Sequence, residues 1–295
     1  MLQLKDFTFE KTEVNVEKIK RYDSEDDFMN LAVGLFKEIG IITTVISCTY
    51  RLDENNMPRK WTRNEAILGG LMVRLSKLQN SFLDQVCQKR METAMIILRC
   101  LGETLINLNY LLEKNNDELS DKFIEYSLRE EKRLLNKINN NIKERGHELP
   151  IEKRMKKSIE RAFKTSNFKV EEVNENNFDS WEKTIYKRAK TVGMEEIYLS
   201  LFSGPSHDIH GNWQNLITNH LEYANGEFSP NTEWKMPRPQ PLFAICVLSA
   251  DTVKLYTEKT MPDCPDKEKV KKILDDINLR ARVADELHEQ FLQNK

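Results

Sequence analysis

The stretch METAMIILRCLGETLINLNYLLE, residues 91–113, decides the fold of this chain. Its apolar side chains recur every three to four residues, which is the spacing of one face of an α-helix. Apolar residues cover so much of the circumference that this helix is expected at the centre of a bundle. The preceding stretch, residues 62–86, is equally apolar, and Thr62 forms a capping box with Glu65 at its start. Two central helices are therefore predicted.

Helical periodicity continues outward on both sides of this pair. Helices are predicted over residues 24–50, 117–145, 151–164, 179–190, 194–202, 207–223 and 266–293, with one more after Pro241. We therefore predict an all-α fold, a multi-helix bundle of about eight to ten helices with a short extended N-terminal arm. The arm covers residues 1–23, and a single helical domain covers residues 24–295, with C-terminal helices in 241–293.

Two breaks in the periodicity set the expected positions of the later helices. Ser203-Gly204-Pro205-Ser206 has the composition of a tight turn, and Ser206 is suited to cap a helix that starts at His207. His207 would then lie at a helix N-terminus, where free backbone N–H groups attract anions. Residues 225–241 contain Gly226 and four prolines and are predicted to form a loop. We find no credible Asn-Gly or Asp-Gly hairpin signal between two strand-like runs.

Composition and cysteine usage limit the classes of function. The 295 residues are 39% hydrophobic and 31% charged with a net charge of −2, so bulk charge argues neither for nor against nucleic-acid binding. The five cysteines form no CxxC pair, which indicates a reduced compartment and no zinc ribbon. The N-terminus lacks a signal-peptide pattern, and apolar runs such as Ile41–Cys48 are too short for a bilayer. We expect a soluble, cytoplasmic protein that contacts no membrane.

Four polar residues, Arg99, Glu103, Asn107 and Tyr110, share one face of the 91–113 helix. Because the surrounding positions are apolar, the stripe is predicted to lie in the interior or in a cleft, with Glu103 as the partner of Arg99. One interpretation is a structural ion pair that fixes the packing. The other is the wall of a functional site, in which Arg99 holds an anion.

The stretch SHDIHGNW, residues 206–213, contains two of the five histidines. His207 and His210 lie three residues apart on one face, where imidazole groups can act as acid, base or phosphate contact. The alternative is a pair of capping or packing histidines. Two histidines at this spacing provide only half of a metal site, and no cofactor-binding motif occurs in the chain. Neither a metal nor a cofactor is therefore predicted.

A basic stripe follows Pro150. Lys153, Lys157, Arg161 and Lys164 share one face of the predicted 151–164 helix. Such a stripe is suited to contact the phosphate backbone of a nucleic acid. It is equally typical of the solvated face of an amphipathic helix.

The order of the polar residues resembles that of a set of bacterial helical proteins of uncharacterised function. The resemblance covers residues 60–225 and rests on an Arg-x-x-x-Glu helix followed by a Tyr, Ser and His-x-x-His-Gly stretch. The matching positions are Arg99, Glu103, Tyr110, Tyr198, Ser203, His207, His210, Gly211 and Trp213. This resemblance brings no established activity with it.

More distantly, the helical character and the histidine stretch are similar to the HEPN superfamily (higher eukaryotes and prokaryotes nucleotide-binding). Many of its members are dimeric RNases of toxin–antitoxin and phage-defence systems, with a signature of Arg, about four to six residues, and His. This chain departs from the signature, because no Arg precedes His207 or His210 at that spacing and the only match is Arg282 with His288. If the likeness holds, Arg99 supplies the positive charge from another helix.

The HEPN likeness implies an RNA-cleaving toxin or phage-defence effector. His207 or His210 would act as general acid or base, and Arg99, oriented by Glu103, would stabilise the charge of the transition state. Substrate positioning is expected from Tyr110, Asn107, Asn212, Ser203 and Tyr198. This prediction requires Arg99 and His210 to meet in space. The alternative is a non-enzymatic binding or sensor protein, in which the same residues form a buried polar network. Such a protein would bind a second copy of itself (a homodimer) or a partner protein.

Overall fold

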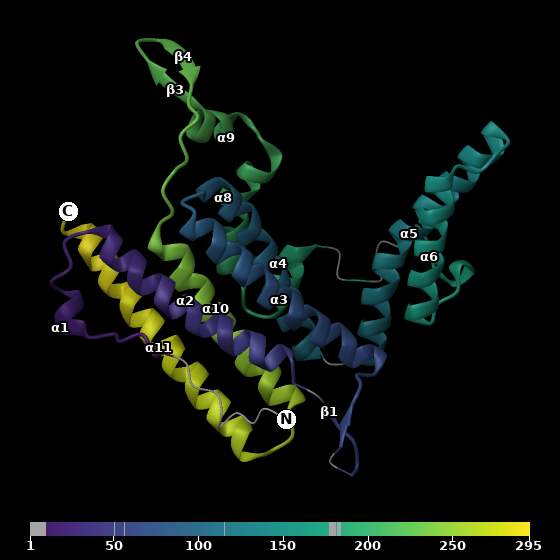
Figure 1. The fold of residues 1–295 in the computed structure, drawn as a ribbon, viewed down its shortest axis with the longest axis horizontal. Coiled ribbons are helices and arrows are strands. Elements are labelled where there is room, and N and C mark those ends of the chain that lie inside the picture. The colour runs from purple at the N-terminus through teal and green to yellow at the C-terminus, as the bar shows by residue number, and fades with distance from the viewer. Residues whose placement is uncertain (1–9, 50, 56, 115, 177–180, 182–183) are drawn as a thin grey trace.

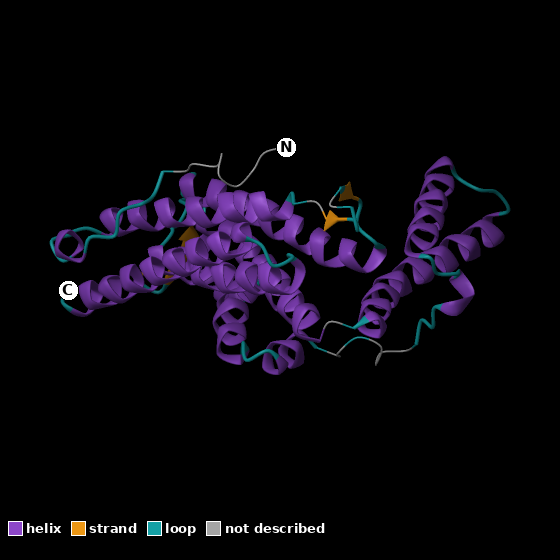
Figure 2. Ribbon diagram, turned by 90° about the horizontal axis from the view of Figure 1, so that it is seen from below, coloured by secondary structure: helices purple, strands orange, loops and turns teal. Residues whose placement is uncertain are grey.

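The computed structural model describes residues 10–49, 51–55, 57–114, 116–176, 181 and 184–295. It confirms the predicted all-α, bundle-like fold (Figures 1 and 2). The α-helices are α1 (Val16–Ile19), α2 (Glu25–Ser47), α3 (Arg63–Cys87), α4 (Met91–Lys114), α5 (Asp117–Arg145), α6 (Pro150–Ser166), α7 (Ile185–Thr191), α8 (Glu195–His210), α9 (Trp213–Asn215), α10 (Pro239–Thr260) and α11 (Pro265–Gln293). The other elements are η2 (Val170–Glu172), the π-helical turn η3 (Leu216–His220) and the strands β1 (Arg51–Leu52), β2 (Pro58–Arg59), β3 (Leu221–Ala224) and β4 (Glu227–Pro230).

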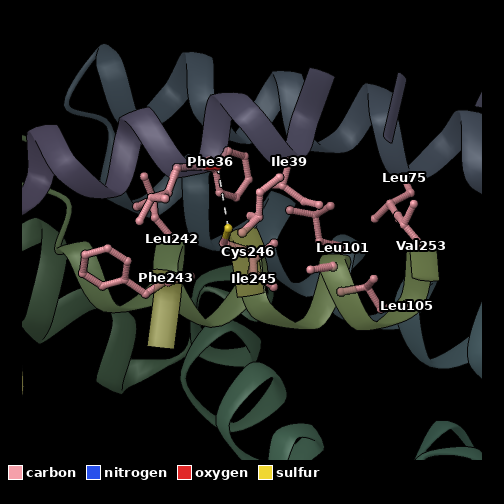
Figure 3. Close-up of a cluster of buried hydrophobic side chains, with 14 of the residues drawn as sticks. Phe36, Ile39, Leu75, Leu101, Leu105, Leu242, Phe243, Ile245, Cys246 and Val253 are labelled. Carbon is pink, nitrogen blue, oxygen red and sulfur yellow. Dashed lines mark hydrogen bonds between the residues drawn. The ribbon is translucent and has the colours of Figure 1, made fainter. Parts of the chain in front are cut away.

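The core lies between α2, α3, α4, α10 and α11, with α8 packed on α4. Local sequence sets the helix starts: the Ser24 hydroxyl caps α2, and the predicted capping box of Thr62 and Glu65 is present at α3. The predicted central place of α4 is confirmed, because its apolar positions are buried from several sides. Figure 3 shows how side chains from α2, α3, α4 and α10 meet in this core, among them Phe36, Leu101 and Cys246.

A buried ion pair fixes the N-terminal segment on the bundle. The Arg280 guanidinium of α11 donates from Nη1 and Nη2 to the two carboxylate oxygens of Glu38 in α2, at 2.8 and 2.6 Å. Its Nη1 also donates to the carbonyl of Thr12 at 2.8 Å. Both charged side chains are almost fully buried. The buried pair therefore links three segments that are far apart in the sequence.

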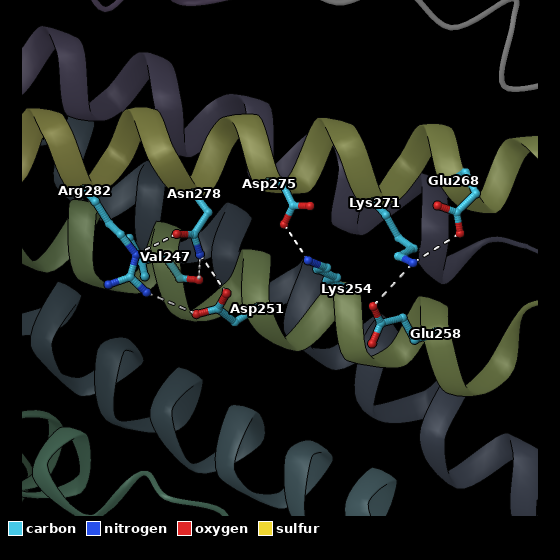
Figure 4. A network of polar contacts seen from close by, with 9 residues as sticks. All are labelled: Val247, Asp251, Lys254, Glu258, Glu268, Lys271, Asp275, Asn278 and Arg282. Carbon is cyan, nitrogen blue, oxygen red and sulfur yellow. Dashed lines mark hydrogen bonds and ion pairs between the residues drawn. The ribbon is translucent and has the colours of Figure 1, made fainter.

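The outer faces of α10 and α11 carry a second polar network (Figure 4). Lys254 lies 2.6 Å from Asp275, and the Asn278 amide donates to Asp251 at 2.7 Å. Exposed pairs of this kind contribute at most about 1 kcal/mol each. Their role is to set the register of the two helices, while the apolar contacts beneath them supply the stability.

α5 and α6 form an antiparallel arm that stands away from the main bundle (Figures 1 and 2). The arm has a small core of its own, made by Leu128, Ile138, Ile159, Phe163 and Val173. Gly146 ends α5 in a left-handed conformation, as the sequence predicts.

The predicted turn at 203–206 is wrong, because α8 runs without interruption from Glu195 to His210 with Pro205 inside it. Pro205 removes one backbone hydrogen bond, but the packing of α8 on α4 outweighs this loss. The approach is close: a Cβ added to Gly102 would lie 2.8 Å from the Leu201 side chain. His207 and His210 therefore lie in the last turn of a helix, not at a helix N-terminus, so the predicted anion site from the α8 dipole does not form.

The predicted helix over 207–223 and loop over 225–241 are also wrong in part. A β-hairpin joins β3 to β4, with the pair Ala224 and Glu227 next to its turn. The turn residues are Asn225 and Gly226, whose φ values of 54° and 86° are those that this dipeptide adopts readily. The Asn-Gly signal was present in the sequence, and the helical interpretation of the preceding residues concealed it.

Two of the core helices are long and apolar enough to cross a membrane, namely α2 and α4. This is weak evidence, because the core helices of soluble proteins pass the same test, and both windows are 56% buried in the bundle. The cytoplasmic location stays a prediction.

His288 of α11 is fully buried, and neither ring nitrogen has a hydrogen-bond partner among the described residues. It packs against Phe28, and its Nε2 lies 3.8 Å from the Glu25 carboxylate. Burial lowers the pKa of His288 below its usual value of 6.5, against the opposing charges of Glu25 and Glu289. The proton therefore binds more tightly to the unfolded chain than to the folded one.

We expect the free energy of unfolding to fall as the pH drops below about 6.5, where only the unfolded chain gains this proton. In a His288→Phe variant, urea denaturation between pH 7 and pH 5 should show a shallower decline than in the wild type. A His210→Phe variant is the control, because His210 is exposed. Equal slopes for wild type and His288→Phe would show that His288 does not titrate in this range.

Candidate functional site

A cleft of about 1280 Å³ lies where the N-terminal turn of α4 meets the C-terminal turn of α8. The start of α2 and the chain at 235–239 complete its walls. Its charged residues are Asp23, Glu25, Asp26, Lys89, Glu92, His207, Asp208, Lys235, Arg238 and Lys295. The cleft is thus lined by acids and bases from parts of the chain that are far apart in the sequence.

Asp208 is held in the cleft by two carboxamides. Its Oδ1 accepts hydrogen bonds from the side chains of Asn215 at 2.7 Å and Asn219 at 2.9 Å. Burial raises the pKa of the Asp208 carboxyl, and the charge of Glu92 acts in the same direction, while the two amides oppose the rise. Asp208 is therefore a fixed carboxyl group with an increased affinity for a proton.

The local backbone explains this arrangement. α8 ends at Gly211, and the Asn212 side chain accepts from the backbone N–H of Asn215 at 3.1 Å, which starts the next turn. The following turn is π-helical, from Leu216 to His220. Such turns are uncommon and occur often at functional sites. Here the turn carries Asn219, and together with Asn215 it directs two amide groups at Asp208.

Glu92 is the most unusual group in the cleft. It is only 9% exposed, and its Oε2 has no hydrogen-bond partner among the described residues. A buried carboxylate oxygen without a partner is costly, so the structure has to account for it by a bound water or ion or by a functional role. Glu92 is also close enough to Asp208 to affect its pKa.

His207 completes the group. Its Nδ1 lies 2.6 Å from the amide nitrogen of Asn212, which fixes the ring. The side chain is partly buried and lines the cleft together with Glu92 and Asp208. Two carboxyl groups and an imidazole in one cleft are the components that general acid–base catalysis needs.

The comparison with known families covers this part of the chain. Residues 65–228 match a family of unknown function (DUF5677). The chain belongs to the DUF5677 family. No curated protein and no solved structure matches the chain significantly. The DUF5677 match agrees with the predicted resemblance over residues 60–225 to an uncharacterised family, and it includes Glu92, His207 and Asp208.

Within the DUF5677 region, Arg99 has its predicted partner Glu103, and it also contacts Phe202. Its Cζ lies 4.9 Å from the ring centroid of Phe202, and its Nη1 lies 3.8 Å from the Glu103 carboxylate. Phe202 precedes His210 by eight residues, which is about 12 Å along a helix axis. No contact between Arg99 and either His207 or His210 is among those of the described residues. The structure therefore joins the histidine stretch to Glu92 and shows no contact between it and Arg99.

The other residues of the predicted stripe lie further along α4, away from the cleft. Tyr110 is buried against Trp181, with ring centroids 5.5 Å apart. Asn107 is partly buried, and its Oδ1 has no hydrogen-bond partner among the described residues. Tyr198 stacks on Phe202 at 4.5 Å. These positions are better suited to packing than to contact with a ligand in the cleft.

The remaining candidates are exposed. Ser203 and His210 lie on the exposed part of α8 and do not line the cleft. Arg282 and His288, the one match to the HEPN signature spacing, lie in different environments. Arg282 is exposed and paired with Asp251, whereas His288 lies in the core. The basic stripe is exposed on α6 of the arm; its members are Lys153, Lys157, Arg161 and Lys164.

Sequence reasoning missed Glu92, Asn215 and Asn219. Glu92 resembles an ordinary acidic residue in a first helical turn, and both asparagines fell in a predicted helix. The Asn215–Asn219 spacing of four residues was the available signal, because it places two amides on one helical face. Among the described residues, no group of three His, Cys, Asp or Glu side chains is placed to hold a metal ion.

Proposed function

We propose that this DUF5677 protein is a general acid–base enzyme that cleaves RNA, with the cleft at the ends of α4 and α8 as its active site. The observation that carries the proposal is the Glu92 carboxylate, which is buried and lacks a partner at Oε2, in the same cleft as His207 and Asp208. A carboxyl group and an imidazole that line the same cleft can supply a general acid and a general base.

The proposed reaction is the attack of a ribose 2′-hydroxyl on the adjacent phosphorus. One member of the pair Glu92 and His207 takes the 2′-hydroxyl proton, and the other gives a proton to the 5′-oxygen as its bond to phosphorus breaks. The products are a 2′,3′-cyclic phosphate and a 5′-hydroxyl end. Asp208 orients the site, and Lys89, Lys235 and Arg238 supply positive charge for the phosphate.

The HEPN likeness supports RNA as the substrate and a toxin or phage-defence effector as the biological role. We propose that the protein acts in the bacterial cytoplasm. We also propose that the exposed basic stripe of α6 contacts the RNA backbone. Arg99 and Glu103 do not line the cleft. In this proposal they stabilise the packing of α8 on α4, because Arg99 contacts the Phe202 ring.

The test compares wild type with His207→Ala and His210→Ala variants on purified cellular RNA. We expect wild type and His210→Ala to cleave it, and His207→Ala to be at least about tenfold slower, because only His207 lines the cleft. His210 is the matched control, since it lies on the same helix and is exposed. If no protein cleaves RNA while His207→Ala loses stability, the cleft has a binding or structural role and the proposal fails.

A further inference from the structure

The β3–β4 hairpin and the turns before it concentrate exposed aromatic side chains beside the cleft. The hairpin projects from the helices (Figure 1). Four large aromatic residues of this region are more than half exposed: Trp213 (59%), Tyr223 (65%), Phe228 (52%) and Trp234 (52%). A soluble protein rarely exposes a contiguous group of this kind without a binding role.

The hairpin separates its side chains by face. The cross-strand pairs Leu221–Pro230 and Tyr223–Phe228 alternate with Glu222–Ser229 and Ala224–Glu227, so apolar residues share one face and acidic ones the other. Trp213 extends the apolar face, with its ring centroid 5.5 Å from that of Phe228. We call Trp213, Tyr223 and Phe228 the aromatic face. Phe228 contacts both other rings, and the Tyr223 ring lies 4.7 Å away.

The chain connects the aromatic face to the cleft on both sides of the hairpin. Gln214, Asn215 and Asn219, which line the cleft, lie in the chain between Trp213 and β3. On the return from the hairpin, Trp234 precedes the cleft residue Lys235, whose carbonyl accepts from the Met91 N–H at 3.3 Å. The Arg90 guanidinium lies 5.8 Å from the Trp234 ring centroid. Trp234 and the cationic residues Arg90 and Lys235 therefore lie together where the chain returns to the cleft.

We infer that the aromatic face stacks unpaired bases of the RNA strand whose phosphate enters the cleft. The inference rests on the proposed function and names its substrate class as single-stranded RNA. Aromatic side chains accept any unpaired base, because every base has a π-face, and adjacent cations balance the phosphates. Glu222 and Glu227 lie on the opposite face of the hairpin, away from the proposed RNA strand.

The test measures binding of a fluorescein-labelled, 2′-O-methylated oligouridine, which cannot be cleaved by 2′-hydroxyl attack, and of a duplex of matched length. We expect wild type to prefer the single strand. A Tyr223→Ala, Phe228→Ala double variant should bind it about tenfold or more weakly. The matched control is Glu222→Gln with Ser229→Ala, a cross-strand pair on the opposite face, which should change affinity less than about twofold. A Tyr223→Trp variant keeps an aromatic ring at this position and should bind the single strand as tightly as wild type does. This result would show that binding depends on the ring and not on the identity of Tyr223.

The outcomes separate this inference from the proposed function. Unchanged affinity in the double variant, or no preference for single strands in wild type, overturns the inference even if RNA is cleaved. Aromatic-dependent binding without cleavage of unmodified RNA by wild type supports the inference and refutes the enzyme. If light scattering shows a wild-type dimer that the double variant loses, without a change in RNA affinity, the aromatic face joins two copies of the chain and the inference is overturned.

Discussion

Replacing Glu92 by glutamine is expected to lower the rate of RNA cleavage by about 10²- to 10⁴-fold, because the amide cannot exchange a proton with the substrate. The shape of the side chain is kept, so the fold should be retained. Glu92 is the buried acid of the cleft, with an unpartnered Oε2. Single-turnover cleavage of a labelled RNA would give the rate of the chemical step, and circular dichroism would report on folding.

The matched control is Glu103→Gln, on the same helix. Glu103 is partly exposed and lies beside Arg99, outside the cleft lining. Its variant should keep a rate within about threefold of wild type, because it touches no reacting atom in the proposed site. A large loss in Glu103→Gln together with a normal rate in Glu92→Gln would return the active site to the Arg99 stripe and contradict the cleft assignment.

Replacing Arg280 by alanine is expected to lower the free energy of unfolding by about 3–5 kcal/mol, because Glu38 would keep a buried charge without its partner. Both side chains are almost fully buried, and Arg280 also binds the carbonyl of Thr12. A loss of this size is a large part of the total stability of a typical domain, about 5–15 kcal/mol. Urea denaturation at neutral pH would measure it.

Arg282→Ala is the control for this loss. Arg282 lies on the same helix, but its pair with Asp251 is exposed, so its removal should cost less than about 1 kcal/mol. A Glu38→Met, Arg280→Met double variant should recover most of the loss, because no unpaired charge remains. Equal losses in Arg280→Ala and Arg282→Ala would show that burial of the Glu38–Arg280 pair contributes little.

The features that could be predicted from the sequence are those that depend on neighbours in the chain. The capping box of Thr62, the central α4 helix and the end of α5 at Gly146 each follow from a few adjacent residues, and all three are present. The error at Pro205 has a tertiary cause. Proline usually breaks a helix, but the contacts of α8 with α4 keep this one continuous.

Of the three residues proposed for the cleft site, Glu92, His207 and Asp208, the sequence analysis named only His207. His207 stood out because histidines are few, but its partner across the cleft depends on how α8 lies on α4. Gly102 lies against Leu201, and Glu92 influences Asp208, so the two helices run antiparallel. This direction brings the first turn of α4, and not the Arg99 turn, to the end of α8. No local pattern encodes that pairing.

The separate core of the α5–α6 arm has a consequence for cooperativity. The five buried residues of the arm pack on one another, whereas the main core joins residues from eight helices. A small core protects its backbone amides less, so we expect the arm to open locally before the bundle unfolds. The basic stripe on α6 thus lies on a part of the molecule that we expect to rearrange more readily than the main core. A surface of that kind can adjust its shape to a partner without rearrangement of the main core.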